Sequence, residues 1–331
     1  MPGRASLTAY LAFLFGSLST IVNGMNSSGC GKALASGINV GGTGQSNNLT
    51  ISSSGVQRTY LLHVPTAYIP SKSHGLIFSF HGRDQTASDQ EELSQFSNSF
   101  FNPHMLAVYP QGLNNEWQGD PDASTNDVSF TLDMITAITA EYCVDENMVY
   151  VAGKSNGGGF AANILACDPN ASKKIAAFAA ASGAFYQGTA GAACDAETVA
   201  FDCHPGRQVI PIIETHGTAD PIIPYSGGSR RDKCLPQIPH FMTSWSNRNG
   251  FGAGNESTSM NDGKVTKYQF DSETSDHSGI ITHYKIDGLG HAWPSTVANV
   301  DGGPTFFNAT ELFMDFFNKW PLNATVNLTG G

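Results

Sequence analysis

Charged residues are scarce in this chain. They make up 14% of its 331 residues, with 17 Lys and Arg against 28 Asp and Glu, and the net charge is −11. The basic residues form no cluster, which argues against nucleic acid as a partner. Glycine is abundant instead, at 36 residues, and hydrophobic residues make up 40% of the chain. This composition is typical of a compact enzyme with many turns and argues against a disordered chain.

Long apolar runs are also lacking beyond the N-terminus, so we expect no segment that spans a membrane. Residues 1–24 are typical of a signal peptide, because Arg4 precedes a largely apolar stretch at 7–18 and compact residues surround a cleavage point near Gly24. A membrane anchor is the alternative interpretation, but the stretch is short and polar residues follow it at once. We therefore expect a secreted, extracellular protein.

The six cysteines lack the C-x-x-C or Cys/His spacing of a metal site, so we expect no zinc. An even number of cysteines in an exported chain favours three disulfides. Cys143 and Cys167 end the predicted helices on either side of one strand, which should bring both to the same edge of the sheet. The predicted pairs are Cys143–Cys167, Cys194–Cys203, which would close a short loop, and Cys30–Cys234.

Seven N-x-[ST] sequons agree with a secretory pathway that glycosylates its cargo, although each one alone is a chance match. We expect them to form a decorated surface. They lie at Asn26, Asn48, Asn170, Asn255, Asn308, Asn323 and Asn327.

Apolar runs typical of strands alternate with helical segments along the chain. The predicted strands lie at 59–64, 75–80, 105–110, 148–152, 175–181, 209–216, 265–270 and 281–286, and the predicted helices at 88–96, 128–142, 158–166 and 306–320. This alternation implies one doubly wound, mostly parallel sheet with helices on both faces. No internal repeat or linker divides the chain, so we expect a monomer with one catalytic domain at 25–331. The domain should begin with an edge hairpin or with a segment that lies over its surface.

A Gly-Lys-Ser-Asn-Gly pentapeptide at 153–157 follows the predicted strand at 148–152 and opens a helical segment. This strand, G-x-S-x-G and helix order is the context of a nucleophile elbow, in which a tight turn exposes the serine. Glycines at both ends relieve the crowding of that turn. Ser155 is therefore the candidate nucleophile, and a glycine-rich turn with an incidental serine is the alternative.

A serine nucleophile needs a histidine base and an acid that orients it, and in this fold class they follow the serine in the order acid, then histidine. Asp220 lies in a loop just after the predicted strand at 209–216, and His291 lies in a glycine-flanked loop after 281–286. Each residue alone could be an ordinary loop residue. Their order and their matching places make Ser155, Asp220 and His291 a candidate catalytic triad.

An oxyanion intermediate also needs two backbone N–H donors. One should come from Asn156, directly after the nucleophile at a helix N-terminus. The other should come from the loop after the strand at 75–80, where Arg83 is the candidate donor and His81 has a structural role.

Several of these motifs together resemble the secreted esterases that include fungal feruloyl esterases and polyhydroxybutyrate depolymerase-like proteins. The motifs are His-Gly at 81–82, Tyr-Pro-Gln-Gly at 109–112, Gly-Lys-Ser-Asn-Gly-Gly at 153–158, His-Gly-Thr-Ala-Asp at 216–220 and Gly-His-Ala-Trp-Pro at 290–294, with Gly-Cys-Gly-Lys at 29–32 similar to the mature start of the fungal enzymes. The resemblance implies an α/β-hydrolase fold, a Ser155/Asp220/His291 triad, no cofactor and action on hydroxycinnamoyl esters of plant cell-wall polysaccharide such as feruloylated arabinoxylan or pectin.

The residues that select the acyl group are harder to identify from sequence. A feruloyl group needs an apolar pocket with a few polar contacts, and the aromatic residues in the loops near the triad are the candidates. They are Trp117, Tyr225 and Trp293, with Pro221 and Ile222 as the apolar candidates beside them. An acetylxylan esterase or a short-chain polyester depolymerase would share the triad, and a non-catalytic carbohydrate-binding relative is the alternative of another class.

Overall fold

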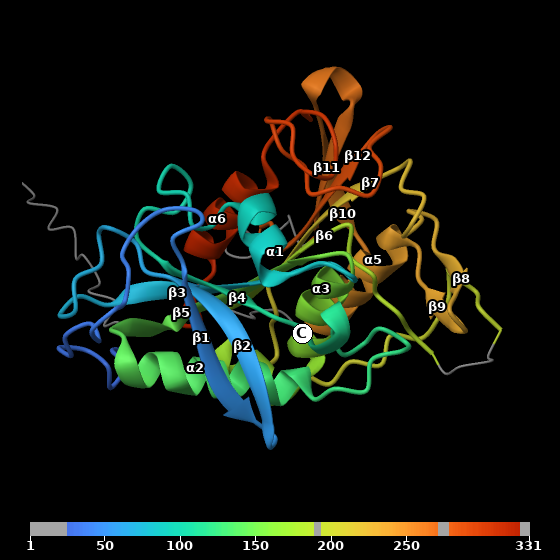
Figure 1. Cartoon of the computed structure of the whole chain (residues 1–331). Coiled ribbons are helices and arrows are strands. Elements are labelled where there is room, and N and C mark those ends of the chain that lie inside the picture. Colours follow the sequence, from blue (N-terminus) through green and yellow to red (C-terminus); the bar gives the residue numbers. More distant parts are fainter. Residues whose placement is uncertain (1–24, 189–192, 271–277, 325–331) are drawn as a thin grey trace, which may run out of the picture.

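The computed structural model describes residues 25–188, 193–270 and 278–324 (Figure 1). The predicted signal peptide at 1–24 and the sequon at Asn327 lie outside these residues. No helix in the described part of the chain is long and apolar enough to cross a membrane.

The described residues form a sheet of ten strands in the order β1-β2-β4-β3-β5-β6-β7-β12-β11-β10. The six strands from β4 to β12 in this order run parallel, and antiparallel strands extend the sheet at both ends. The strands are β1 (Asn47–Ser53), β2 (Val56–His63), β3 (His74–Phe80), β4 (Leu106–Pro110), β5 (Val144–Lys154), β6 (Ala177–Ala181), β7 (Ile212–Gly217), β10 (Asn255–Met260), β11 (Val265–Phe270) and β12 (Ile281–Ile286).

Helices cover both faces of this sheet, with α1 and α6 on one side and α2, α3 and α5 on the other (Figure 1). The helices are α1 (Ala87–Ser94), α2 (Asp127–Glu141), α3 (Asn156–Gly159), which continues as a π-helix over Phe160–Leu165, α4 (Ala171–Lys174), α5 (Ile238–Asn249) and α6 (Ala309–Lys319). A small separate hairpin joins β8 (Gly228–Arg230) to β9 (Lys233–Leu235). The prediction of a mostly parallel sheet between two layers of helices is confirmed.

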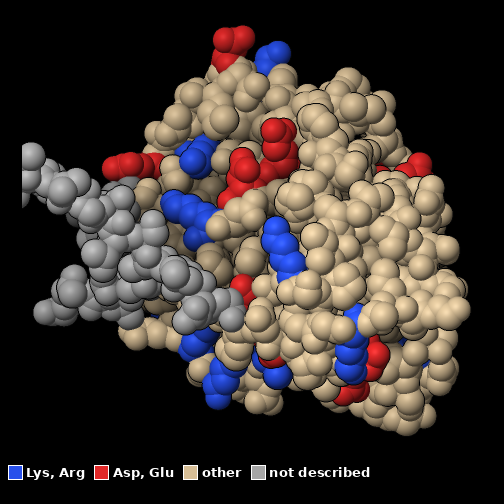
Figure 2. Space-filling view, turned by 90° about the vertical axis from the view of Figure 1, so that its left-hand side faces the viewer, with Lys and Arg blue, Asp and Glu red and all other residues tan. Residues whose placement is uncertain are grey.

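The central strands are buried on both faces because helices pack on each side. All seven residues of β3 and all five of β6 are buried, which agrees with sequences that are apolar except for His74 and Ser79. Most charged side chains lie outside this core, although a few, including Arg58, Asp127 and Glu214, are buried. On the face shown in Figure 2, uncharged residues cover most of the surface and charged groups of both signs stand singly or in small clusters.

The predicted disulfide pairing is wrong, although all six cysteines are paired. The observed disulfides are Cys30–Cys143, Cys167–Cys203 and Cys194–Cys234, in place of Cys143–Cys167, Cys194–Cys203 and Cys30–Cys234. The N-terminal segment accounts for the difference at Cys143, because the backbone N–H of Ser27 donates to Val144 and that of Gly29 to Thr139. This docking places Cys30, rather than Cys167, beside Cys143.

One predicted glycosylation site conflicts with the structure. Asn308 is only 4% exposed, and its side-chain oxygen accepts a hydrogen bond from the Thr310 N–H as the N-cap of α6. A glycan needs an exposed amide, so Asn308 is not a suitable acceptor in the folded protein. The five other sequon asparagines among the described residues are exposed: Asn26, Asn48, Asn170, Asn255 and Asn323.

Candidate active site

Ser155 lies in the turn between β5 and α3, with φ 54° and ψ −120°. A positive φ is costly for a residue with a side chain, so the surrounding backbone must hold it. A Cβ on Gly153 would lie 2.2 Å from the Gly157 carbonyl oxygen, and one on Gly157 would lie 2.3 Å from the carbonyl oxygen of Phe80. Both glycines are therefore required for the close approach that forms this turn.

Hydrogen bonds fix the backbone of Ser155 in this conformation. Its N–H donates to Ala181 at 3.0 Å, and its carbonyl oxygen accepts from the N–H groups of Gly159 and Ala184, both at 2.9 Å. The residue is 9% exposed and lines a cavity of about 250 Å³ at the carboxyl ends of the parallel strands. These contacts present the Ser155 side chain to that cavity.

Asp220 and His291 meet beside the same cavity. They follow β7 and β12, which are parallel neighbours, so both strands end at the same edge of the sheet. Asp220 Oδ2 lies 2.7 Å from His291 Nδ1, and Asp220 Oδ1 accepts from the N–H groups of Ile222 and Ile223, both at 2.8 Å. His291 lines the cavity together with Ser155. The structure thus brings the three predicted triad residues to one place.

The ionised form of Asp220 is stabilised despite its burial. Burial raises the pKa of this carboxyl group, but hydrogen bonds from His216 and His291 and from the Ile223 backbone outweigh that effect, and the net pKa lies below its usual range. A carboxylate in this position fixes the His291 ring with Nδ1 protonated, which leaves Nε2 as the basic nitrogen.

The predicted oxyanion donors lie on either side of the nucleophile. A Cβ on Gly82 would lie 3.5 Å from the Ser155 Cβ, so the loop that carries Arg83 packs directly against the elbow. Within the described residues, the backbone N–H groups of Arg83 and Asn156 donate to no protein acceptor. Both residues line the cavity. Two unpaired N–H groups beside a serine are what an oxyanion requires.

His81 supports this loop as a neutral ring. Its Nδ1 lies 2.7 Å from the Gly82 carbonyl oxygen, and its Nε2 accepts from the N–H of Gly112 at 3.0 Å. Burial lowers the pKa of His81 to about 4, although a backbone hydrogen bond to Gly82 acts in the opposite direction. The structural role predicted for His81 agrees with these contacts.

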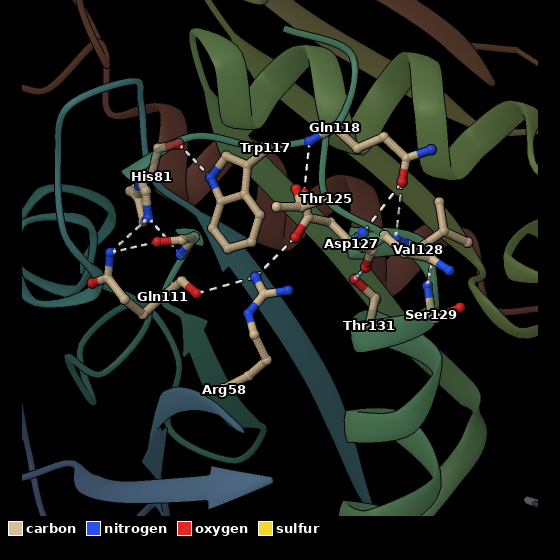
Figure 3. A network of polar contacts seen from close by, with 12 residues as sticks. Arg58, His81, Gln111, Trp117, Gln118, Thr125, Asp127, Val128, Ser129 and Thr131 are labelled. Atoms are coloured by element: carbon tan, nitrogen blue, oxygen red, sulfur yellow. Dashed lines mark hydrogen bonds and ion pairs between the residues drawn. The ribbon is translucent and has the colours of Figure 1, made fainter. Parts of the chain in front are cut away.

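A buried ion pair continues the network behind the loop (Figure 3). Arg58 and Asp127 side chains are 3% and 0% exposed, and their nearest atoms lie 2.8 Å apart. Arg58 also donates to the Gln111 carbonyl oxygen, and the Gln111 side chain lies 3.4 Å from His81 Nε2. The N-terminus of α2, where Asp127 lies, is thereby linked to the loop that carries Arg83.

The three aromatic residues predicted to bind substrate do not line the cavity. Trp117 is 0% exposed, and its ring nitrogen donates to His81 while its backbone N–H donates to the Asn156 side chain. Trp293 is 1% exposed, and its indole nitrogen donates to Thr310. The Tyr225 hydroxyl instead lies 2.9 Å from His283 Nε2. None of the three therefore forms part of the cavity wall, because the two tryptophan rings are buried in the protein and the Tyr225 hydroxyl faces His283.

Other side chains form the walls instead. Tyr186 follows the carboxyl end of β6, and its position next to a strand end was the available sequence signal. Of the other wall residues, Ile222 was a sequence candidate for the acyl pocket, Asp84 and Gln85 belong to the predicted oxyanion loop, and Lys154 is the last residue of β5. The sequence interpretation did not assign the remaining ones, from the β8–β9 hairpin and from other loops, to the site. They are Ile223, Arg230, Arg231, Asp120 and Ala184.

The wall is held together by ion pairs. Arg83 and Arg231 both contact Asp120 Oδ1, at 2.6 and 2.7 Å, which joins the oxyanion loop to the tip of the β8–β9 hairpin. Lys154 Nζ lies 2.5 Å from Asp301 Oδ1, and Asp301 Oδ2 accepts from the Trp293 N–H. This second pair ties the nucleophile strand to the loop that follows His291.

A serine elbow, an Asp–His pair and two open N–H groups at the carboxyl edge of a doubly wound sheet define a hydrolase of the α/β-hydrolase fold. No protein-family model matches the chain. Acetyl xylan esterase from Aspergillus awamori superimposes on it with a TM-score of 0.58 at 14% identity, covering 82% of this chain and 99% of that structure, which supports the fold.

Relatives by sequence identify the family. Feruloyl esterase C of Emericella nidulans is 30% identical over 218 residues, which are 63% of this chain and 67% of that protein. Feruloyl esterase D of Neurospora crassa is 28% identical over 244 residues, 70% of this chain and 74% of that protein. The chain belongs to the fungal feruloyl esterase family and is a carboxylic ester hydrolase.

Proposed function

We propose that this protein is a secreted serine esterase that hydrolyses feruloyl and related hydroxycinnamoyl esters of plant cell-wall polysaccharide. The observation that carries the proposal is the 2.7 Å contact between Asp220 and His291 in the wall of the cavity onto which Ser155 opens. The substrate class is supported by relatives that are named feruloyl esterases. The three disulfides fit an oxidising, extracellular location.

In the proposed mechanism, His291 Nε2 takes the proton of the Ser155 hydroxyl while the serine oxygen attacks the ester carbonyl carbon. The N–H groups of Arg83 and Asn156 donate to the oxyanion of the tetrahedral intermediate. The sugar oxygen then leaves with the proton from His291, and an acyl-enzyme remains on Ser155. Water, deprotonated by the same histidine, attacks the acyl carbon and forms a second tetrahedral intermediate. The bond from that carbon to Ser155 Oγ then breaks, the serine oxygen takes the proton from His291, and the hydroxycinnamic acid is released.

Part of the cavity lining suits an aromatic acyl group with polar substituents. Ile222 and Ile223 supply apolar wall, and Tyr186 supplies an aromatic ring whose hydroxyl has no hydrogen-bond partner among the described residues. A planar cinnamoyl group can pack on such a wall while its phenolic oxygen meets a polar partner. The charged residues of the rim remain for the sugar. We propose that one catalytic domain, monomeric and spanning 25–331, carries this site.

The test is turnover of methyl ferulate by purified protein. Ser155→Ala should lower kcat by at least about 10⁴-fold without loss of thermal stability, because the nucleophile is removed from an intact site. Ser88→Ala, at an exposed serine of α1, is the matched control and should keep full activity. Substantial methyl ferulate hydrolysis by the Ser155 variant would overturn the assignment of the nucleophile.

The acyl specificity needs a separate comparison. Equal amounts of enzyme, counted by fluorophosphonate labelling of Ser155, should be assayed on methyl ferulate, acetylated xylan and polyhydroxybutyrate. We expect the highest kcat/KM on methyl ferulate. Faster release from acetylated xylan or from the polyester would replace the feruloyl assignment, and a failure to label would point to a non-catalytic protein.

A further inference from the structure

A continuous chain of buried titratable side chains lies behind Asp220. His216 Nε2 is 3.3 Å from Asp220 Oδ2, the same oxygen that faces His291. His216 Nδ1 is 2.7 Å from Glu214 Oε1, and Glu214 Oε2 is 2.6 Å from His283 Nδ1. The side chains of His216, Glu214 and Asp220 are all 0% exposed. The mechanism above uses neither His216 nor Glu214.

The hydrogen-bond partners fix where the protons of His216 lie. Its Nε2 must carry a proton because the Ile223 carbonyl oxygen, at 2.8 Å, can only accept. Its Nδ1 faces a carboxylate that also lies against His283, so a proton is shared between Nδ1 and Glu214 Oε1. Burial lowers the pKa of His216, but Glu214 and the hydrogen bond to Asp220 raise it to about 10. His216 is thus an imidazolium between two carboxylates.

We propose that the buried His216–Glu214 pair is a charge-tuning element of the active site that keeps His291 available as a base at acidic pH. His216 and His291 share one oxygen of Asp220, with their nitrogens 3.3 and 2.7 Å from it. A permanent positive charge on His216 makes a second positive charge on His291 less favourable. This inference rests on the proposed triad and assigns positioning roles to His216 and Glu214.

The other groups around His216 do not replace this charge. The Tyr225 ring packs against it with ring centroids 6.0 Å apart. Lys285 on β12 lies opposite His216 in the strand register, but it pairs with Asp287 at 3.2 Å. The neighbouring strand β6 consists of alanines and one phenylalanine. Glu214, Asp220 and His291 are therefore the charged or titratable groups that govern His216 among the described residues, and His283 acts on it through Glu214.

The expected effect follows from Coulomb's law. The two imidazole nitrogens lie no more than about 6 Å apart, since both contact one oxygen. At an effective dielectric constant of about 40–80, a unit charge at that distance changes proton affinity by about 0.5–1 pH unit. Removing the positive charge of His216 should favour protonation of His291. The pH at which activity is half-maximal on the acidic side should therefore rise by about 0.5–1 unit in His216→Gln, which removes only the positive charge. The rise should be smaller in Glu214→Gln, which removes the carboxylate charge as well.

Glu214→Gln is the more conservative variant, because the amide keeps the shape and leaves a neutral His216 that still donates to Asp220. His216→Gln removes the ring but retains an N–H donor. Profiles of kcat/KM against pH should show the acidic limb at higher pH in both variants, while the plateau value of kcat/KM falls only several-fold. Thr215→Val is the matched control, because Thr215 is equally buried on β7 and its hydroxyl lacks a partner among the described residues. Its acidic limb should match that of the unaltered enzyme.

An unmoved acidic limb in His216→Gln, or an equal movement in Thr215→Val, would overturn the proposal. If the Gln variants do not fold, nitrogen-15 NMR of the His216 ring in the unaltered protein still decides. Both ring nitrogens should be protonated at neutral pH, and an unprotonated nitrogen would refute the imidazolium. If the proposed triad is wrong, Ser155→Ala will still hydrolyse methyl ferulate. That result would not change the protonation state of His216 measured by NMR, so the two proposals can fail separately.

Discussion

Gly153→Ala tests the origin of the nucleophile turn most directly. The added Cβ would lie 2.2 Å from the Gly157 carbonyl oxygen and 2.7 Å from the Gly158 nitrogen. Both atoms belong to backbone that cannot rotate away, and unstrained contacts of carbon are about 3.5 Å or longer. The two sides of the turn must therefore separate by about 1 Å. A displacement of that size at a reacting group costs about 10²-fold in rate.

The assay is kcat/KM on methyl ferulate, corrected for competent sites by fluorophosphonate titration. We expect a loss of about 10²-fold or more in Gly153→Ala, with a loss of stability of about 1–3 kcal/mol from overpacking. Gly254→Ala is the matched control, because nothing lies within 4 Å of the Cβ that it would add, and it should keep full activity. Unchanged kcat/KM in Gly153→Ala would refute the steric account of the elbow.

Two further predictions concern stability. Arg58→Met removes the guanidinium that lies over the Phe130 ring and leaves the fully buried Asp127 without its cation, so the melting temperature should fall by about 6–10 °C, from a loss of about 3–5 kcal/mol; an unchanged melting curve would contradict the importance of the pair. Burial lowers the pKa values of His63 and His81 to about 4, so the unfolded chain binds more protons between about pH 4 and 6.5 and stability should fall as the pH drops through that window. His63→Leu should flatten this dependence in denaturant titrations at several pH values, and an equally steep dependence in that variant would count against the argument.

The central strands of the sheet could be predicted from the sequence, because a strand that is buried on both faces needs a run of apolar residues, and such a run is a local feature. The run at 75–80 is apolar except for Ser79, and the strand that contains it is wholly buried. β10 has no such run, since five of its six residues are exposed, and its position in the sheet depends on pairing with β11. α5 buries Phe241, Met242 and Trp245, but polar residues between them obscure the helical spacing.

The same contrast explains the site. The places of Ser155, Asp220 and His291 follow from chain order and from strand ends, which are local features. The cavity walls depend on where distant loops meet. Arg231 reaches the cavity at the tip of β8–β9, which the Cys194–Cys234 disulfide fastens to another loop. Trp117 and Trp293 come from loops that we expected to lie near the triad, but their side chains are buried in the core. Whether such a side chain lines the cavity or packs in the core depends on side-chain packing, which the sequence pattern does not reveal.

The disulfide pattern has a consequence for biosynthesis. Cys30 and Cys143 are consecutive in the order in which the cysteines leave the ribosome, so their bond can form without any choice of partner. The other two bonds interleave: Cys167 and Cys194 both emerge before Cys203, yet they are not partners. A bond between them during synthesis must be undone by thiol–disulfide exchange. The yield of active enzyme in an expression host therefore depends on disulfide isomerase activity, independently of how stable the finished fold is.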